Sequence, residues 1–113
     1  MYMPLVASMN RVSTAPIGPN HTVALFDCIK SAGSVEYAYL LVVSDDRTQK
    51  PVYVVASEVN SMATNFGGGS HFLGVFTEAG HINMGSSDEW GDPHRFFPKA
   101  LELASEEFRK LGA

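Results

Sequence analysis

Two apolar runs separated by a short polar segment constrain the fold of this chain more than any other feature. Residues 36–44 (EYAYLLVVS) and 51–56 (PVYVVA) flank residues 45–50 (DDRTQK). Val, Tyr and Leu favour extended strands, so the pattern predicts a β-hairpin with a solvated loop. A strand exposed on one face alternates apolar with polar residues, whereas this first strand is apolar on both faces, so we expect both to be covered. One face would carry Tyr37, Tyr39, Leu41 and Val43, and the other Ala38, Leu40 and Val42.

A second hairpin is predicted over residues 71–77 (HFLGVFT) and 81–86 (HINMGS). The connecting Glu-Ala-Gly segment is a poor two-residue primed turn, so we expect a type I turn followed by a glycine bulge. This register places Phe76 opposite Ile82. The competing register places Phe76 opposite Asn83, and a slip of one residue moves every side chain to the other face.

The C-terminal residues predict an amphipathic helix. Apolar residues recur there at helical spacing, with Glu102, Ser105, Glu106 and Arg109 on the wet side. The apolar stripe, which we expect to be core, consists of Phe97, Leu101, Ala104, Phe108 and Leu111. Pro98 suits the first turn of this helix and Gly112 its end.

Three further segments have weaker signals. Residues 22–30 (TVALFDCIK) favour a strand, with a helix as the alternative. Residues 57–66 (SEVNSMATNF) could extend the preceding strand, but their apolar spacing favours a short second helix. Residues 1–20, rich in Pro, Gly, Ser and Thr, are interpreted as an irregular arm with a short extended piece near residues 5–9.

Together these elements predict a single α+β domain over residues 21–113, preceded by the arm. Its architecture would be an antiparallel sheet of about five strands packed against the C-terminal helix. A chain of 113 residues fits one domain, and its 45% hydrophobic content is sufficient for a core.

Charge and composition narrow the function classes. The formal net charge is −4, and the eight basic residues never cluster, so binding to nucleic acid or to anionic lipid is not expected. No apolar run reaches the length of a membrane span, and the N-terminus lacks the basic region of a signal peptide. Cys28 is the only cysteine, which favours a reducing compartment, and we expect a cytoplasmic protein.

No metal or other cofactor is expected. In the favoured register the two histidines of the second hairpin, His71 and His81, lie about 20 Å apart, and His21 and His94 have no ligand-like spacing to either. Cys28 sits among apolar neighbours and is expected to be an inert small hydrophobe.

Two polar segments are the candidate ligand site. Three consecutive glycines in residues 65–71 (NFGGGSH) expose backbone N–H groups that could hold an anion, although a flexible connector is the simpler interpretation. Residues 86–95 (SSDEWGDPHR) hold the densest polar patch, although acids are also typical of helix starts. The candidate binding residues are Gly67, Gly68, Gly69, His71, Asp88, Glu89, Trp90, Asp92 and His94.

Two functions remain open. We favour a non-catalytic interaction module that self-associates, most simply as a homodimer, through an apolar sheet face that one helix cannot cover. The N-terminal arm is the rival cover for that face, through Leu5, Val6 and Ile17. The alternative function is a small-molecule-binding protein or small enzyme with its site at residues 65–71 and 86–95.

Overall fold

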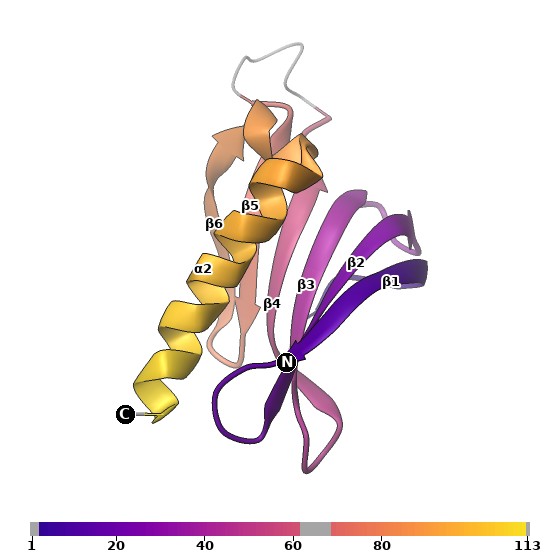
Figure 1. The fold of residues 1–113 in the computed structure, drawn as a ribbon. Helices are drawn as coiled ribbons and strands as arrows, with labels where there is room; N and C mark the ends of the chain where they lie inside the picture. Colours follow the sequence, from indigo (N-terminus) through magenta and orange to yellow (C-terminus); the bar gives the residue numbers. More distant parts are fainter. Residues whose placement is uncertain (1–2, 62–68, 113) are drawn as a thin grey trace.

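The sheet follows the order of the chain. The computed structural model describes residues 3–61 and 69–112, and these form a six-stranded antiparallel sheet, β1 to β6, in which each strand pairs with its neighbour in sequence (Figure 1). The predicted α+β fold is therefore confirmed, with six strands instead of about five. The elements are β1 (Val6–Pro16), β2 (His21–Ser31), β3 (Tyr37–Asp45), β4 (Lys50–Val59), β5 (His71–Thr77), β6 (Gly80–Ser87), the 3-10 helix η1 (Asp88–Gly91) and α2 (Pro93–Gly112).

Helix α2 covers one face of the sheet, here called the outer face, where it contacts β3 and β4 (Figure 1). Successive side chains of a strand point to opposite faces of the sheet, so every second residue of the central strands points at the helix. The core of this face consists of Val23, Leu41, Val43, Tyr53, Val55, Leu73, Val75, Phe96, Ala100, Ala104 and Phe108. Phe96 is completely buried and is the main anchor of the helix.

The buried stripe of α2 differs in part from the predicted one. Ala104 and Phe108 are buried as expected, but Phe97 and Leu101 are only partly buried at the margin of the core. The helix begins at Pro93, so Pro98 lies inside it and not in its first turn. The side chain of Leu111 is outside the described residues. Within the described ranges, no helix is both long and apolar enough to span a membrane.

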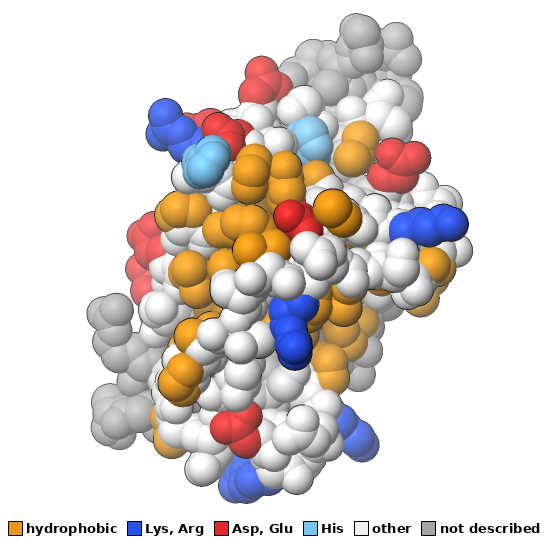
Figure 2. All heavy atoms as spheres, turned by 45° about the vertical axis from the view of Figure 1, so that its right-hand side comes forward, with side chains coloured by type: hydrophobic (Ala, Val, Ile, Leu, Met, Phe, Trp, Pro, Cys, Tyr) orange, Lys and Arg blue, Asp and Glu red, His pale blue; other side chains and the backbone are white. Residues whose placement is uncertain are grey.

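The margin of the outer core reaches the surface. Leu25 on β2 and Tyr39 on β3 are partly buried against it, beside Phe97 and Leu101. Figure 2 shows hydrophobic side chains gathered on one face of the molecule, with histidine and both signs of charge around them. The helix therefore shields the centre of the outer face more completely than its edge.

The opposite, inner face is covered by the chain itself, because β1 and β2 curl over it. Met3, Val6, Phe26 and Ile29 pack against its core, which consists of Tyr37, Leu40, Val42, Val54, Ala56 and Phe76. The expectation that both faces of the first hairpin are covered is confirmed. The prediction of an irregular N-terminal arm is wrong. Residues 6–16 form an eleven-residue edge strand, whose backbone pairs with β2.

Both hairpins are present, but two details of register differ from expectation. A register shift between Tyr37 and Tyr39 turns Tyr37 to the inner face, away from Tyr39. In the second hairpin Phe76 pairs with His81 and not with Ile82, which instead faces Val75. Thr77 pairs with Gly80, so the strands are joined by Glu78 and Ala79 alone, and the glycine bulge expected at this turn is not there.

A bulge does lie farther along β6. Gly85 has a φ of +106° and the register shifts between Phe72 and Gly74, so that His71 pairs with Ser87 at the far end of the hairpin. A left-handed conformation of this kind favours glycine.

The structure also decides the secondary structure of the two segments that could be strand or helix, as far as it describes them. Residues 22–30 lie in β2, so the strand interpretation is confirmed. Residues 57–59 continue β4, so the predicted short helix does not begin at Ser57. The rest of that prediction, from residue 62 to residue 66, lies outside the described residues.

Candidate functional site

The end of the sheet brings several predicted site residues together. The N–H of Gly69 donates to Ser86 Oγ at 3.1 Å, and the N–H of Ser70 donates to Asp88 Oδ1 at 2.8 Å. The start of β5 is therefore tied to the end of β6 and to η1. Gly67 and Gly68 lie outside the described residues.

His71 lies in the same corner. Its Nδ1 is 2.7 Å from Ser70 Oγ, and its ring packs so closely on Gly91 that a Cβ at residue 91 would meet it at 2.6 Å. The close approach explains why a glycine is needed at position 91. The ring is thus held between the loop before β5 and the end of η1.

Trp90 is fixed by the sheet. Its carbonyl accepts a hydrogen bond from the hydroxyl of Ser57, a completely buried residue on β4, and its side chain packs against the outer core. A buried polar group is costly unless it is paired, so this bond anchors η1 to the sheet. The described contacts of Trp90 are those of a packing residue.

The remaining predicted residues lie at the start of α2. Asp92 Oδ1 accepts from the N–H of His94 at 2.9 Å, as a helix-capping side chain does. Glu89 is 3.9 Å from Arg95, and both side chains are more than half exposed. Among residues 3–61 and 69–112 no cluster of three or more His, Cys, Asp and Glu side chains could hold a metal ion.

A second polar site was not predicted. Glu58 on β4 and His81 on β6 form an ion pair on the inner face, with Oε1 and Nε2 3.2 Å apart. The Glu58 side chain is 12% exposed, and the His81 ring lies flat on Phe76, with ring centroids 4.2 Å apart. Polar and aromatic contacts therefore both hold the imidazole in place.

Gly74 on β5 makes this pair possible. It lies between the two strands, and a Cβ there would approach Glu58 Oε1 to 2.7 Å and His81 Nε2 to 2.9 Å. Burial raises the pKa of the Glu58 carboxyl, and the attraction of His81 offsets this only in part. The sequence signal was an acid at position 58 that alternates with Val54 and Ala56, which becomes visible once β4 is extended to Val59.

The strand that carries His81 is an edge of the sheet. Within residues 3–61 and 69–112, β6 pairs with β5 alone, and none of its eight residues is Asp, Glu, Lys or Arg. Ile82 is 57% exposed and Met84 is 50% exposed. An edge strand with exposed apolar side chains and no Asp, Glu, Lys or Arg is an arrangement that proteins usually avoid.

Comparison of the chain with protein-family models, with curated proteins and with solved structures found no match.

Proposed function

We propose that this protein is an interaction module that self-associates through the edge strand β6. The observation that carries the proposal is the exposure of Ile82 and Met84 on an edge strand without Asp, Glu, Lys or Arg. Such an edge presents unpaired backbone N–H and C=O groups, which a further strand can satisfy. The polar groups of the corner formed by residues 69–71 and 86–94 are largely bonded to one another, which favours this edge over the corner.

In this proposal the two copies of the chain meet at an edge of the sheet and not at a face. The expectation of a face-to-face dimer depended on an uncovered apolar face, and the inner face is covered by Met3, Val6, Phe26 and Ile29 of the same chain. The N-terminal segment, which was the alternative cover for the sheet face, thus removes the original reason to expect a face-to-face dimer. The exposed edge β6 is a different reason to expect self-association.

The other edge of the sheet is better protected. β1 carries Arg11, ends at Pro16 and has three register shifts against β2. Cations, prolines and bulges are the usual devices that keep edge strands from pairing. β6 has a single bulge, at Met84 and Gly85, which leaves residues 80–83 in unbroken register with β5.

A second copy of this chain is the partner that fits residues 80–83. In a two-fold antiparallel pairing centred on Ile82, that residue faces its own copy, and His81 faces the partner's Asn83. No like charges of Asp, Glu, Lys or Arg face each other, whereas opposed like charges would destabilise the pair. Closed two-fold pairing is also the commonest form of self-association.

Light scattering coupled to size-exclusion chromatography tests this assignment. At tens of micromolar we expect twice the 12.2 kDa mass of the chain. Ile82→Lys places a cation at the centre of the pairing and should give the monomer mass. Val12→Lys, at a 49% exposed position on β1, is the matched control and should leave the dimer intact.

A wild-type mass of 12.2 kDa would overturn the proposal. So would a dimer that Val12→Lys dissociates and Ile82→Lys does not, because the contact would then involve β1. Masses that rise continuously with concentration would indicate pairing of β1 with β6 in open chains, and would also contradict a closed two-fold dimer.

A further inference from the structure

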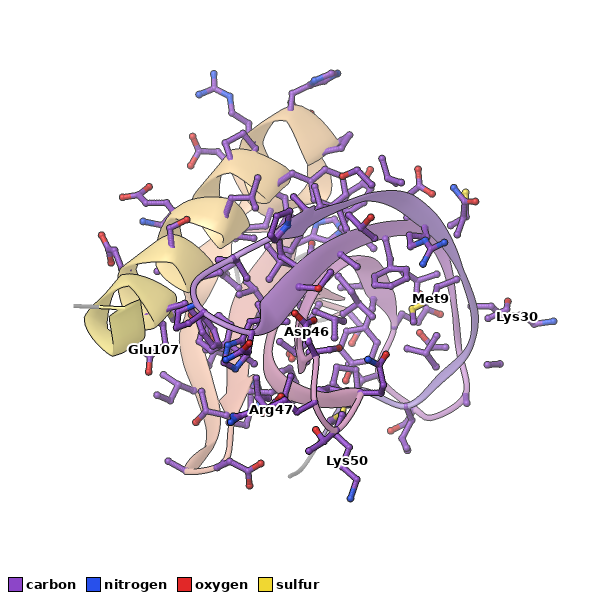
Figure 3. The ribbon with its side chains drawn as sticks, turned by 60° about the horizontal axis from the view of Figure 1, so that its bottom comes forward. Met9, Lys30, Asp46, Arg47, Lys50 and Glu107 are labelled. Carbon is purple, nitrogen blue, oxygen red and sulfur yellow. The ribbon has the colours of Figure 1, made fainter. Side chains whose placement is uncertain are left out.

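The curled strands leave a hollow at one end of the inner face. Its volume is about 510 Å³, within the range of sites that hold small molecules, and the mouth of a curled or closed sheet is a common place for such sites. Figure 3 looks at this end and shows Asp46 over the ring formed by the strands, with Lys50 pointing away. The lining consists of Arg11, Thr14, Thr22, Ala24, Phe26, Ser44, Asp46 and Gln49.

The strand register explains why these side chains converge. Arg11 pairs with Phe26, Thr14 with Ala24, and Thr22 with Ser44, so three successive strands direct them to the same face. Asp46 and Gln49 belong to the loop between β3 and β4, which overhangs this end. The hollow is therefore formed by paired strands on one side and a loop on the other.

The charges in the hollow are opposite and are not paired with each other. The side chain of Arg11 has no hydrogen bond or ion pair to any residue in the described part of the chain. Asp46 Oδ1 accepts from the Thr22 hydroxyl at 2.6 Å, and the Gln49 amide donates to the Asp46 carbonyl at 2.8 Å. The mouth thus presents a free guanidinium and an oriented carboxylate in one space.

These groups restrict the chemistry of a ligand. A simple anion would meet Asp46 and a simple cation would meet Arg11, so a singly charged ligand is repelled by one of them. An apolar ligand would leave the hydroxyls of Thr14 and Ser44 without water. A neutral molecule with several hydroxyls can accept from Arg11 and donate to Asp46 at once.

We propose that this mouth binds a neutral polyhydroxylated ligand of monosaccharide size. Ala24 and Phe26 provide an apolar floor for the C–H groups of the ring, and Arg11, Asp46 and Gln49 provide planar polar groups for its hydroxyls. The site is on the inner face of β1 and β2, and it does not depend on the function proposed for β6.

Protein-observed NMR with D-glucose, D-galactose and D-mannose tests the site. We expect at least one of these sugars to cause saturable shifts of the backbone amides of residues 14, 24 and 26. Arg11→Ala should raise the Kd of that sugar at least about tenfold, because a charged hydrogen bond is lost. Arg11 is exposed and has no described partner, so its removal should not unfold the protein.

Two controls keep the result specific. Arg47→Ala removes a cation that is 71% exposed and bonded to Asp45, outside the hollow, and should leave the Kd unchanged. Acetate and methylammonium should cause no saturable shifts at these amides. The proposal would be overturned by the absence of saturable shifts with all three sugars, by equal loss of affinity in the two arginine variants, or by saturable binding of either ion.

Discussion

Glu58 and His81 are in contact, with Oε1 and Nε2 3.2 Å apart, although a whole strand separates the strands that carry them. The contact exists because the intervening residue, Gly74, has no side chain. The pair therefore connects the edge strand β6 directly to β4.

Gly74→Ala should destabilise the fold. A Cβ at this position would come within 3 Å of both Glu58 Oε1 and His81 Nε2, so the pair must separate or β5 must shift. Overpacking of this kind costs about 1–3 kcal/mol of unfolding free energy, measurable by denaturant titration. Gly33→Ala is the control: its Cβ would meet only the flexible side chain of Leu5, and an equal loss in that variant would contradict the explanation.

Glu58→Gln should change how stability depends on pH. Burial raises the folded-state pKa of Glu58 above its ordinary value, so the folded state holds this proton more tightly than the unfolded chain. The resulting stabilisation is present at low pH and is lost as the pH rises through the folded-state pKa. The unfolding free energy of the wild type relative to the variant should therefore fall as the pH rises from the ordinary pKa of a glutamate through the higher folded-state pKa.

Glu102→Gln is the control for this titration, because that side chain is 60% exposed on α2. It should leave the pH dependence of the wild type unchanged. A wild-type advantage over Glu58→Gln that grows as the pH rises would show that attraction to His81, and not burial, dominates.

Phe96→Ala should be the most damaging truncation on α2. Phe96 is completely buried between the helix and the sheet, so its loss should cost about 3–5 kcal/mol of unfolding free energy. Phe97→Ala removes the same side chain from a partly buried position and should cost less. Equal shifts of the denaturant midpoint in the two variants would contradict the observed helix face.

Ser57→Ala should loosen η1. The variant leaves the Trp90 carbonyl without its donor, at a cost of about 1–3 kcal/mol. Trp90 is the only tryptophan, so its fluorescence should shift toward longer wavelength as water reaches the ring. An unchanged spectrum together with unchanged stability would show that the hydroxyl is not an anchor.

Tyr53 should ionise later than an ordinary tyrosine. Burial, together with the nearby Glu107 and Glu106, raises its pKa to about 12. In a titration followed by phenolate absorbance, part of the signal of the four tyrosines should therefore appear only near that pH. Tyr53→Phe should remove this late part, while circular dichroism checks that the protein is still folded.

The elements that were predicted correctly are those whose apolar residues repeat with a clear period. The two hairpins and the C-terminal helix belong to this group. The edge strand β1 was missed because its Ser, Thr, Asn and Pro residues are typical of loops, and its strand geometry comes from backbone pairing with β2. The buried stripe of α2 was misplaced because the helix begins at Pro93, before the apolar period becomes obvious.

The candidate sites depend on contacts that local sequence patterns do not encode. The structure does gather residues 69–71 and 86–91, which the sequence placed at strand ends. The Glu58–His81 pair requires β4 to reach Val59, the correct register of β6, and a glycine on the strand between them. Each of these is a tertiary feature. An error of one residue in the predicted extent or register of either strand is enough for the pair to be missed.

The consecutive order of the strands has a consequence for how the chain reaches its native state. Each hairpin brings together segments that are already close along the chain, so the entropy lost in closing each loop is small. Short sequence separations are associated with rapid folding among β-rich proteins. Helix α2 is the exception, because it closes a long loop back onto β3 and β4. During synthesis on the ribosome, the apolar outer face of the sheet would therefore remain uncovered until the twenty residues of α2 emerge.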